Sequence, residues 1–542
     1  MVEHIFQAVH GPSVLNFDKH DEAASINERH KGYYDFLLRN TSTTPKSDPL
    51  YPLPSQMLFL WQVYTDNIDS FIKILHAPTV SNLIRALRGG YEHLGLDLKA
   101  FLLAIAFAAV VSLKDQEVQS SFNIDKARLV SQYQHGTEVA LAKADIVGKP
   151  DLTALQAFTI YVSIMQHIDG TRAPWILNGL LVRAAVSLNL HRDRATESTG
   201  SPLKTESQRR LWWQICLIDS RSEFQQASAF SVAEKMFDTE LPTDLDDQAL
   251  HVTTSKAIIV GELTDTSIFL LRCKIWKFSQ QLQHTTDVQL AFGVFRQGRA
   301  SIEECHSRLF SSGLPLHCFV ATTTRLFFNR VELTLQGKIH LAASTKAPVS
   351  KSSYNDNVFA LYLSILEDVH ALQHEPRWEG WRWQIKGRQP PWQALGFVLK
   401  HLHECQPDSH SDRALLAISK SLKDAPEEYH QEVQYQQLLV MMSAVERRGE
   451  LNTKAAPSMN MYETSKLPDF DPSLTVPDTE VFSQDFVTGN SSTWKMHELN
   501  VDLPTEADDE TGHNPTLTDE SWDLGSMELD QPFWDFWNIN NI

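Results

Sequence analysis

The spacing of apolar residues most constrains the fold, because from Leu53 to about Arg447 they recur at intervals of three and four. In one such stretch, residues 152–168, the apolar positions are Leu152, Leu155, Phe158, Val162 and Met165. They share one face of an α-helix, with Asp151 as its predicted N-cap and Gly170 at its end. A second helix is predicted from about Pro174, and its apolar face consists of Leu177, Leu181, Ala184 and Leu188.

Other parts of the chain agree with an all-α body. We find no convincing run of alternating β-branched residues and no repeat of fixed period. The most apolar run, Phe101 to Val111, is far shorter than the roughly 20 residues that a membrane helix needs, and it predicts a buried helix. Two polar interruptions, Thr196–Ser207 and Ala343–Tyr354, are predicted to be loops.

Charge and composition divide the 542 residues into three parts. The formal net charge is −19, but residues Glu463 to Ile542 hold 18 acidic residues against only Lys466 and Lys495. We expect residues 1–50 to form a flexible arm, residues 53–450 the helical body and residues 455–542 a disordered acidic tail. The tail is rich in Ser, Thr, Asp, Asn and Pro, so it cannot bury enough apolar surface to offset the entropy lost on folding.

The end of the tail carries the first functional signal. Between Ser521 and Asn541 large aromatic residues alternate with acids, which is typical of an activation domain that enters a groove of its partner as a transient helix. A solubilising tail and a peptide that docks on its own body are the alternatives. The aromatic candidates for co-activator binding are Trp522, Phe533, Trp534, Phe536 and Trp537.

Three aspartates, Asp244, Asp246 and Asp247 in the string TDLDD, suggest a magnesium site of a helical enzyme that acts on diphosphates. No second acidic or basic motif completes such a site, and we interpret the aspartates as a solvated loop. The pair Arg209-Arg210 is similarly interpreted as solvating its helix rather than contacting phosphate.

A group of histidines could be read as metal ligands, but an i, i+2 pair points to different sides of a helix. We therefore interpret them as ordinary surface or core residues. They are His374, His401, His403 and His410. No sequence motif of a hydrolase, a zinc protease or a nucleotide-binding fold occurs, so we expect no catalytic residue and no metal ligand.

The five cysteines are scattered and include no C-x-x-C pair. This spacing argues against a disulfide framework and against a cysteine-based zinc site, and it predicts a reducing compartment. Residues 1–50 contain no cysteine.

Five segments together resemble the middle homology region of the fungal-specific transcription factors, a family usually headed by a binuclear zinc cluster. The opening helix of that family resembles Leu60–Pro78, and its central helix pair resembles Leu152–Asp193. The string RRLWWQICLIDSR (Arg209–Arg221), the segment Phe237–Asp247 and the helix of Pro391–Cys405 follow in the order expected for the family.

The resemblance implies structural roles for the residues that carry it, in close helix packing and in buried or half-buried pairing of Arg209 and Asp219. Those residues are Trp175, Gly179, Arg183, His191, Arg192, Asp193, Arg209, Arg210, Trp212, Trp213, Asp219, Pro242 and Trp392. Gln226–Ala229 departs from the family, which often has a glycine turn there. The second departure is the missing zinc cluster, so we expect neither zinc nor another cofactor in this chain.

The resemblance further implies a nuclear transcriptional regulator, not an enzyme, that controls a specialised-metabolite gene set. Its expected partners are co-activators, DNA reached directly or through a zinc-cluster partner, and a second subunit in a homo- or heterodimer, with no membrane. Two alternatives stay open: a co-regulator or decoy that dimerises with a zinc-cluster factor without binding DNA, and an all-α metal-dependent enzyme.

Overall fold

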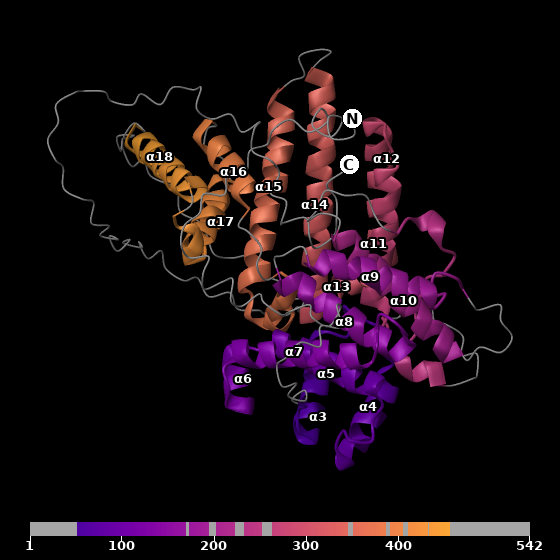
Figure 1. Ribbon diagram of the computed structural model, residues 1–542. Coiled ribbons are helices and arrows are strands. Elements are labelled where there is room, and N and C mark those ends of the chain that lie inside the picture. The colour runs from indigo at the N-terminus through magenta and orange to yellow at the C-terminus, as the bar shows by residue number, and fades with distance from the viewer. Residues whose placement is uncertain are drawn as a thin grey trace, which may run out of the picture. The chain divides into compact units, whose positions relative to one another are not determined.

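All secondary structure that the computed structural model describes is helical (Figure 1). The described residues are 51–169, 173–193, 202–222, 232–251, 263–344, 351–385, 391–404, 410–431 and 433–455. No strand occurs within these ranges, which confirms the predicted all-α class. The expected arm of residues 1–50 lies outside them, as does the expected tail apart from Ala455, so the two predictions stay predictions.

The N-terminal half of the described chain consists of eight α-helices and one short 3₁₀ helix. They are α3 (Pro54–Asn67), α4 (Ala77–Arg85), η1 (Ala86–Gly89), α5 (Leu96–Ser112), α6 (Asp115–Phe122), α7 (Lys126–Lys143), α8 (Leu152–Ile168), α9 (Ala173–Ser187) and α10 (Pro202–Ser222).

The C-terminal half continues from η3 and η4 through the longest helices. Its elements are η3 (Glu234–Met236), η4 (Asp247–His251), α11 (Ser267–Gln283), α12 (Val288–Cys305), α13 (Ser307–Ser311), α14 (Pro315–Ser344), α15 (Lys351–His374), η5 (Pro376–Gln384), α16 (Trp392–Glu404), α17 (Ser411–Lys423), η6 (Glu427–Tyr429) and α18 (Val433–Ala455). The described helices as far as Arg447 belong to one unit, and the last residues of α18 fall in a second.

Helix α5 forms the centre of the N-terminal half. Every residue from Ala100 to Ser112 is buried, as expected for a helix that is apolar on all sides. It packs against α3, α7 and α8, so the run Phe101–Val111 is the buried helix that its sequence predicts.

Helix α8 confirms the periodicity argument in detail. The Asp151 side chain caps its N-terminus, where Oδ1 accepts a hydrogen bond from the Ala154 backbone N–H at 2.8 Å. This bond satisfies one of the amide groups left without a helical partner at the first turn. Leu155, Phe158 and Val162 are fully buried. Helix α9 begins one residue before the predicted Pro174.

Both predicted loops are wrong in part. Helix α10 already begins at Pro202, because proline suits the first turn of a helix, where its missing N–H is not needed. Helix α14 continues to Ser344 and α15 starts at Lys351, so both ends of the second predicted loop are helical. The rest of that segment, residues 345–350, lies outside the described residues.

The C-terminal half is built around α14 and α15, which run side by side in Figure 1 and pack on each other. Helices α16 and α17 cover α15, and α12 covers α14. The short helix η5, which follows α15, packs against α3, α5 and α14 and joins the two halves.

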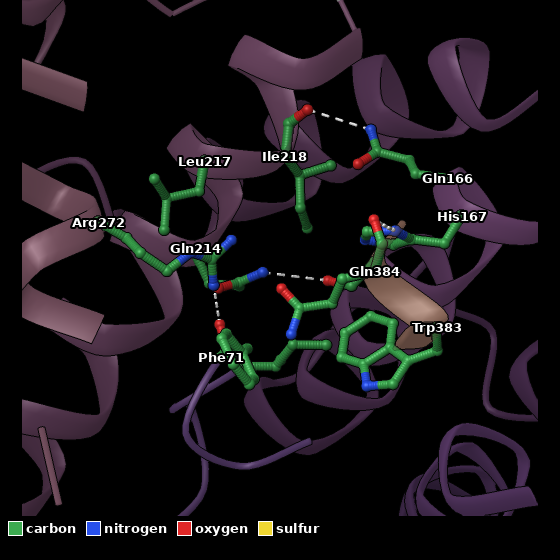
Figure 2. A pocket seen from close by; sticks show the side chains of 11 residues that line it. Phe71, Gln166, His167, Gln214, Leu217, Ile218, Arg272, Trp383 and Gln384 are labelled. Atoms are coloured by element: carbon green, nitrogen blue, oxygen red, sulfur yellow. Dashed lines mark hydrogen bonds between the residues drawn. The ribbon is translucent and has the colours of Figure 1, made fainter. Parts of the chain in front are cut away.

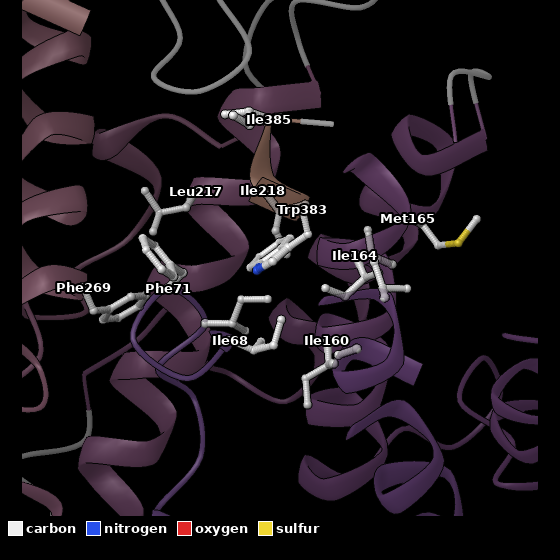
Figure 3. Close-up of a cluster of buried hydrophobic side chains, with 14 of the residues drawn as sticks. Ile68, Phe71, Ile160, Ile164, Met165, Leu217, Ile218, Phe269, Trp383 and Ile385 are labelled. Atoms are coloured by element: carbon white, nitrogen blue, oxygen red, sulfur yellow. The ribbon is translucent and has the colours of Figure 1, made fainter. Parts of the chain in front are cut away.

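Trp383 of η5 lies at the junction of the two halves. It is surrounded by Phe71, Ile164 and Ile218, which come from distant parts of the N-terminal half (Figure 3). The rings of Trp383 and Phe71 meet edge to face with centroids 6.4 Å apart, a favourable geometry for aromatic pairs. The hydrophobic core is thus continuous from the first helices to η5.

Candidate functional site

Three of the five segments that resemble the fungal family meet at one carboxylate, that of Asp247. Its Oδ1 accepts a hydrogen bond from Arg210 Nη1 at 2.6 Å, and its Oδ2 accepts one from Lys73 Nζ at 3.0 Å. The backbone N–H of Ala77 also donates to Oδ2, at 2.9 Å, and the side chain of Asp247 is only 2% exposed. The solvated-loop interpretation is therefore wrong for this aspartate, because two cations from other segments enclose it.

The interpretation of Arg210 as a residue that solvates its helix is also wrong, because Arg210 is buried and paired with carboxylates. Its side chain is 2% exposed and does not solvate helix α10. Besides Asp247, it pairs through Nε with Glu206 Oε1 at 3.0 Å, one turn earlier on the helix. The carboxylate of Glu206 in turn accepts the backbone N–H of Thr243, so Arg210 and Glu206 tie α10 to the segment before η4.

Lys73 extends these contacts to a fifth group. Its ammonium nitrogen lies 2.5 Å from Oδ2 of Asp69. The five side chains, which we name the buried charge cluster, are Asp69, Lys73, Glu206, Arg210 and Asp247.

The pKa values in the cluster follow its geometry. Burial alone would raise the pKa of Asp247, but the Lys73 and Arg210 cations and the Ala77 N–H hold it below its ordinary value. Burial alone would lower the pKa of Lys73, but the carboxylates of Asp69 and Asp247 raise it. Asp247, Lys73 and Arg210 are therefore charged in the folded state at neutral pH.

The other two aspartates of the string are exposed and bind separate partners. Oδ1 of Asp244 accepts the hydroxyl of Thr264 at 2.5 Å. Oδ1 of Asp246 accepts the backbone N–H of Asp265 at 2.9 Å. Each aspartate is thus satisfied by its own contacts, which account for the string without a shared ion.

A second junction forms at the residues His191, Arg192 and Asp193, just after α9. Oδ2 of Asp193 accepts hydrogen bonds from Arg209 Nε at 2.8 Å and from the Glu240 backbone N–H at 2.9 Å. Arg192 pairs with Asp238 at the surface. The predicted half-buried pairing of Arg209 thus has Asp193 as its partner.

The two tryptophans of the same string complete this junction. Trp212 and Trp213 are buried, and both rings meet Phe237 edge to face. Trp213 also meets Trp276 of α11 edge to face, and its Nε1 donates to the Glu240 carbonyl at 2.8 Å. These contacts explain the bulky residues of the string by packing.

Asp219 is buried and accepts hydrogen bonds from two neutral groups. Its Oδ1 accepts from Asn178 Nδ2 at 2.7 Å and its Oδ2 from the Val232 N–H at 2.8 Å. An amide and a backbone N–H can stabilise a buried carboxylate as well as a cation can.

The remaining motif residues occupy structural or surface positions. Pro242 and Trp392 are buried, and the Trp392 ring meets Tyr429 edge to face. Trp175 and Gly179 are half-buried, and Arg183 is exposed and donates to the carbonyl of Gly179 on its own helix. The five aromatic residues expected to bind co-activators lie outside the described residues.

A small polar cavity lies where α8, α10, α11 and η5 meet (Figure 2). Its volume of about 30 Å³ is sufficient for one or two water molecules. Gln166 donates to the carbonyl of Ile218 at 3.1 Å, and His167 Nδ1 bonds the carbonyl of Gln384 at 3.0 Å. The first bond links α8 to α10 within the N-terminal half, and the second joins that half to η5. The space is too small for an organic ligand.

A larger cleft of about 770 Å³ lies between the end of α5, the start of α6, η5 and the segment from α17 to η6. Its wall includes Lys114, Arg382, His374 and Asp424, together with apolar residues such as Trp383. This volume is in the range of small-molecule sites.

The histidines noted in the sequence do not converge. His401 stacks on Phe359, with ring centroids 4.2 Å apart, and His403 and His410 are exposed. Only His374 lies in a group with other metal-binding side chains, and its companions are His370 and Asp424.

Comparison with known proteins shows which family the first part of the body resembles. Residues 61–312 match the fungal specific transcription factor domain. The likeness to that family covers a little under half of the chain. The matched residues contain the whole buried charge cluster.

Three relatives carry names of the same kind. The chain is 30% identical over 301 residues to the aurofusarin cluster transcription factor aurR2 of Gibberella zeae, which is 54% of this chain and 45% of that protein. It is 29% identical over 373 residues to the C6 finger domain transcription factor nscR of Trichophyton verrucosum, covering 66% and 55% respectively. It is 27% identical over 399 residues to the C6 finger domain transcription factor adaR of Aspergillus niger, covering 68% and 50%.

The chain therefore spans about half the length of the curated relatives it matches. Among the described residues, no helix is long and apolar enough to cross a bilayer.

Sequence reasoning missed Lys73, Glu206 and His370. A signal existed for each of the first two: Lys73 stands inside the apolar run Phe71–Leu75, and Glu206 precedes Arg210 by one helical turn. His370 precedes His374 by the same spacing. In each case the decisive partner comes from a distant segment.

Proposed function

We propose that this chain regulates transcription and acts in the nucleus. The observation that carries this proposal is the match of residues 61–312 to the fungal specific transcription factor domain. Relatives that align with more than half of the chain are transcription factors by name. The motif residues of the domain make structural contacts, so regulation would use surfaces outside them.

The proposal has a finer part, which is activation of a specialised-metabolite gene set. Two observations support it: one relative is named for the aurofusarin cluster, and the C-terminal segment alternates aromatic and acidic residues. The tail would recruit co-activators through its aromatic residues. The body would reach DNA directly or through a zinc-cluster partner in a homo- or heterodimer.

Chromatin occupancy of the tagged chain in its native cells, read together with transcript levels, tests the regulator proposal. We expect discrete promoter occupancy, and a fall of the transcripts of the occupied genes when the gene for this chain is deleted. A rise of those transcripts would replace activation by the decoy mechanism. No enrichment at any promoter, with abundant protein outside the nucleus, would refute the proposal.

A pair of matched variants tests the tail. Replacement of Phe533, Trp534, Phe536 and Trp537 by Ala should abolish activation while protein abundance stays constant, because the apolar contacts with the co-activator are lost. The control replaces four polar residues of the same segment by Ala and should activate normally; these are Gln531, Asn538, Asn540 and Asn541. Unchanged transcripts in the aromatic variant would remove the tail from the mechanism.

A further inference from the structure

Two histidines and one carboxylate from separate helices come together beside the large cleft. His370 and His374 lie one turn apart near the end of α15, and Asp424 follows the last residue of α17. One ligand atom of each residue lies within 4.8 Å of the ligand atoms of the other two. His370 Nε2 is 3.0 Å from Asp424 Oδ2, and the two imidazole rings stack with centroids 4.5 Å apart.

We propose that His370, His374 and Asp424 bind a Zn²⁺ ion. Two imidazoles and one carboxylate are a common ligand set for zinc, which then keeps a fourth position open. Mg²⁺ and Ca²⁺ prefer oxygen ligands, so the two imidazoles select against them. The site lies outside residues 61–312 and uses none of the motif residues of the fungal domain.

The protonation states suit a metal. Partial burial and the neighbouring His370 lower the pKa of His374, which favours the neutral imidazole that coordinates zinc. The hydrogen bond from His370 lowers the pKa of Asp424, which favours its carboxylate form. Zinc would replace this bond, since a His370 Nε2 that coordinates the ion no longer carries the N–H that donates it.

The required rearrangement is small. Zn–N and Zn–O distances of about 2.0–2.1 Å place the ligands of a tetrahedral ion about 3.3 Å apart. One pair in the group is already at 3.0 Å and none is beyond 4.8 Å. His374 and Asp424 are exposed, so rotation of their side chains can close the remaining gap without moving either helix.

The two helices are held together independently of a metal. Arg413 of α17 forms an ion pair with Glu367 of α15, with Nη2 and Oε2 2.5 Å apart. The two helices also pack on each other, so the segments that carry the ligands are neighbours before zinc binds, which reduces the entropy that binding must overcome.

The surroundings place the open position in the cleft. His374 and Asp424 both line it, so water in the cleft can supply the fourth ligand. The nearby cations Arg382 and Lys423 repel a Zn²⁺ ion and so disfavour its binding. The −1 charge of Asp424 offsets this repulsion in part.

Titration of the full-length, EDTA-stripped chain with Zn²⁺ alone tests the proposal by calorimetry. We expect one Zn²⁺ site that the double variant His370→Ala/His374→Ala loses. The single variant His374→Ala should weaken binding by at least about 100-fold, because even the loss of an outer-shell partner costs 10- to 100-fold. Mg²⁺ should not compete.

His403→Ala is the matched control, because His403 is an exposed histidine of the neighbouring α16. It should bind Zn²⁺ like the wild type, and circular dichroism should show equal helix content in all variants. Co²⁺ should give the visible absorption of a tetrahedral ion with the wild type but not with the double variant. Equal Zn²⁺ binding by wild type and double variant, or equal loss in His403→Ala, would overturn the proposal. These outcomes do not depend on whether the chain regulates transcription.

Discussion

Substitution of Asp247 by Asn tests the buried charge cluster directly. Asparagine has nearly the same size, so the change removes the negative charge without opening a cavity. It also places an amide NH₂ group, a hydrogen-bond donor, among the donors that Asp247 accepts from Arg210 Nη1 at 2.6 Å, Lys73 Nζ at 3.0 Å and Ala77 N–H at 2.9 Å.

The expected loss of stability follows from the ion pairs that remain after the substitution. Loss of one partner of a buried ion pair costs about 3–5 kcal/mol, because the other charge stays buried without compensation. Here Arg210 keeps Glu206 and Lys73 keeps Asp69, which lowers the cost. Two cations are affected instead of one, which raises it. We therefore expect a loss of about 3–5 kcal/mol in the free energy of unfolding, a large fraction of the 5–15 kcal/mol typical of a domain.

Urea unfolding followed by circular dichroism and by tryptophan fluorescence measures this loss. Asp246→Asn is the control, since Asp246 is exposed in the same string, and it should change stability by less than about 0.5 kcal/mol. Equal effects of the two substitutions, or a loss below about 1 kcal/mol for Asp247→Asn, would refute the argument that buried ion pairing at Asp247 stabilises the body.

A double-mutant cycle separates ion pairing from a general intolerance of this position. Arg210→Met and Asp247→Leu each remove one partner from a charge that stays buried, whereas the double variant removes both charges of the pair together. The double variant should be less destabilised than the sum of the two single variants by about 0.5–3 kcal/mol. Additive losses would contradict direct coupling of the two side chains.

Three further measurements test other parts of the structure. Gly298→Ala should cost about 1–3 kcal/mol of unfolding free energy, because its Cβ would lie 2.3 Å from the Phe278 ring. Gly293→Ala on the same helix meets no atom within 4 Å and should stabilise by up to about 1 kcal/mol. Equal urea midpoints of the two variants would contradict this packing. Asp193→Asn should cost about 1–2 kcal/mol, less than Asp247→Asn, because its ion pair is partly exposed, and a larger loss in the same assay would reverse the ranking of the two junctions. The folded-state pKa of Asp247 is lowered, so its contribution to stability is present above the unfolded pKa of about 4 and is lost as pH falls through the folded value. On acidification below about pH 4, wild type should therefore lose more stability than Asp247→Asn. Parallel pH profiles of the two proteins would argue against the lowered pKa.

Local sequence features predicted local structure well. The apolar face of α8 and its Asp151 cap depend on residues within one or two turns, so periodicity and capping rules determine them. The loop prediction for residues 202–207 failed because the stretch is polar, and polarity alone does not distinguish a loop from the first turns of a helix.

The charged groups were misread because their partners are distant in sequence. Asp247 is 174 residues from Lys73 and 37 from Arg210, and nothing within a few residues of it indicates burial. The histidines show the same limit: neighbours in sequence, His401 and His403, do not share a site, whereas His370 and Asp424 meet across 54 residues.

The position of the buried charge cluster also shows that the strings carrying the family resemblance have a structural role. Its members belong to the strings around Lys73, Arg210 and Asp247. Loss of any one of these charges removes a partner from a neighbour that stays buried, which is destabilising. Those strings are thus explained by folding requirements, and the same contacts would be needed whatever the function of the chain. Under the proposed function, we therefore expect specificity to arise from residues that folding does not fix. The cleft beside His374 and the aromatic residues near the C-terminus are where we expect substitutions to change regulation while the body stays folded.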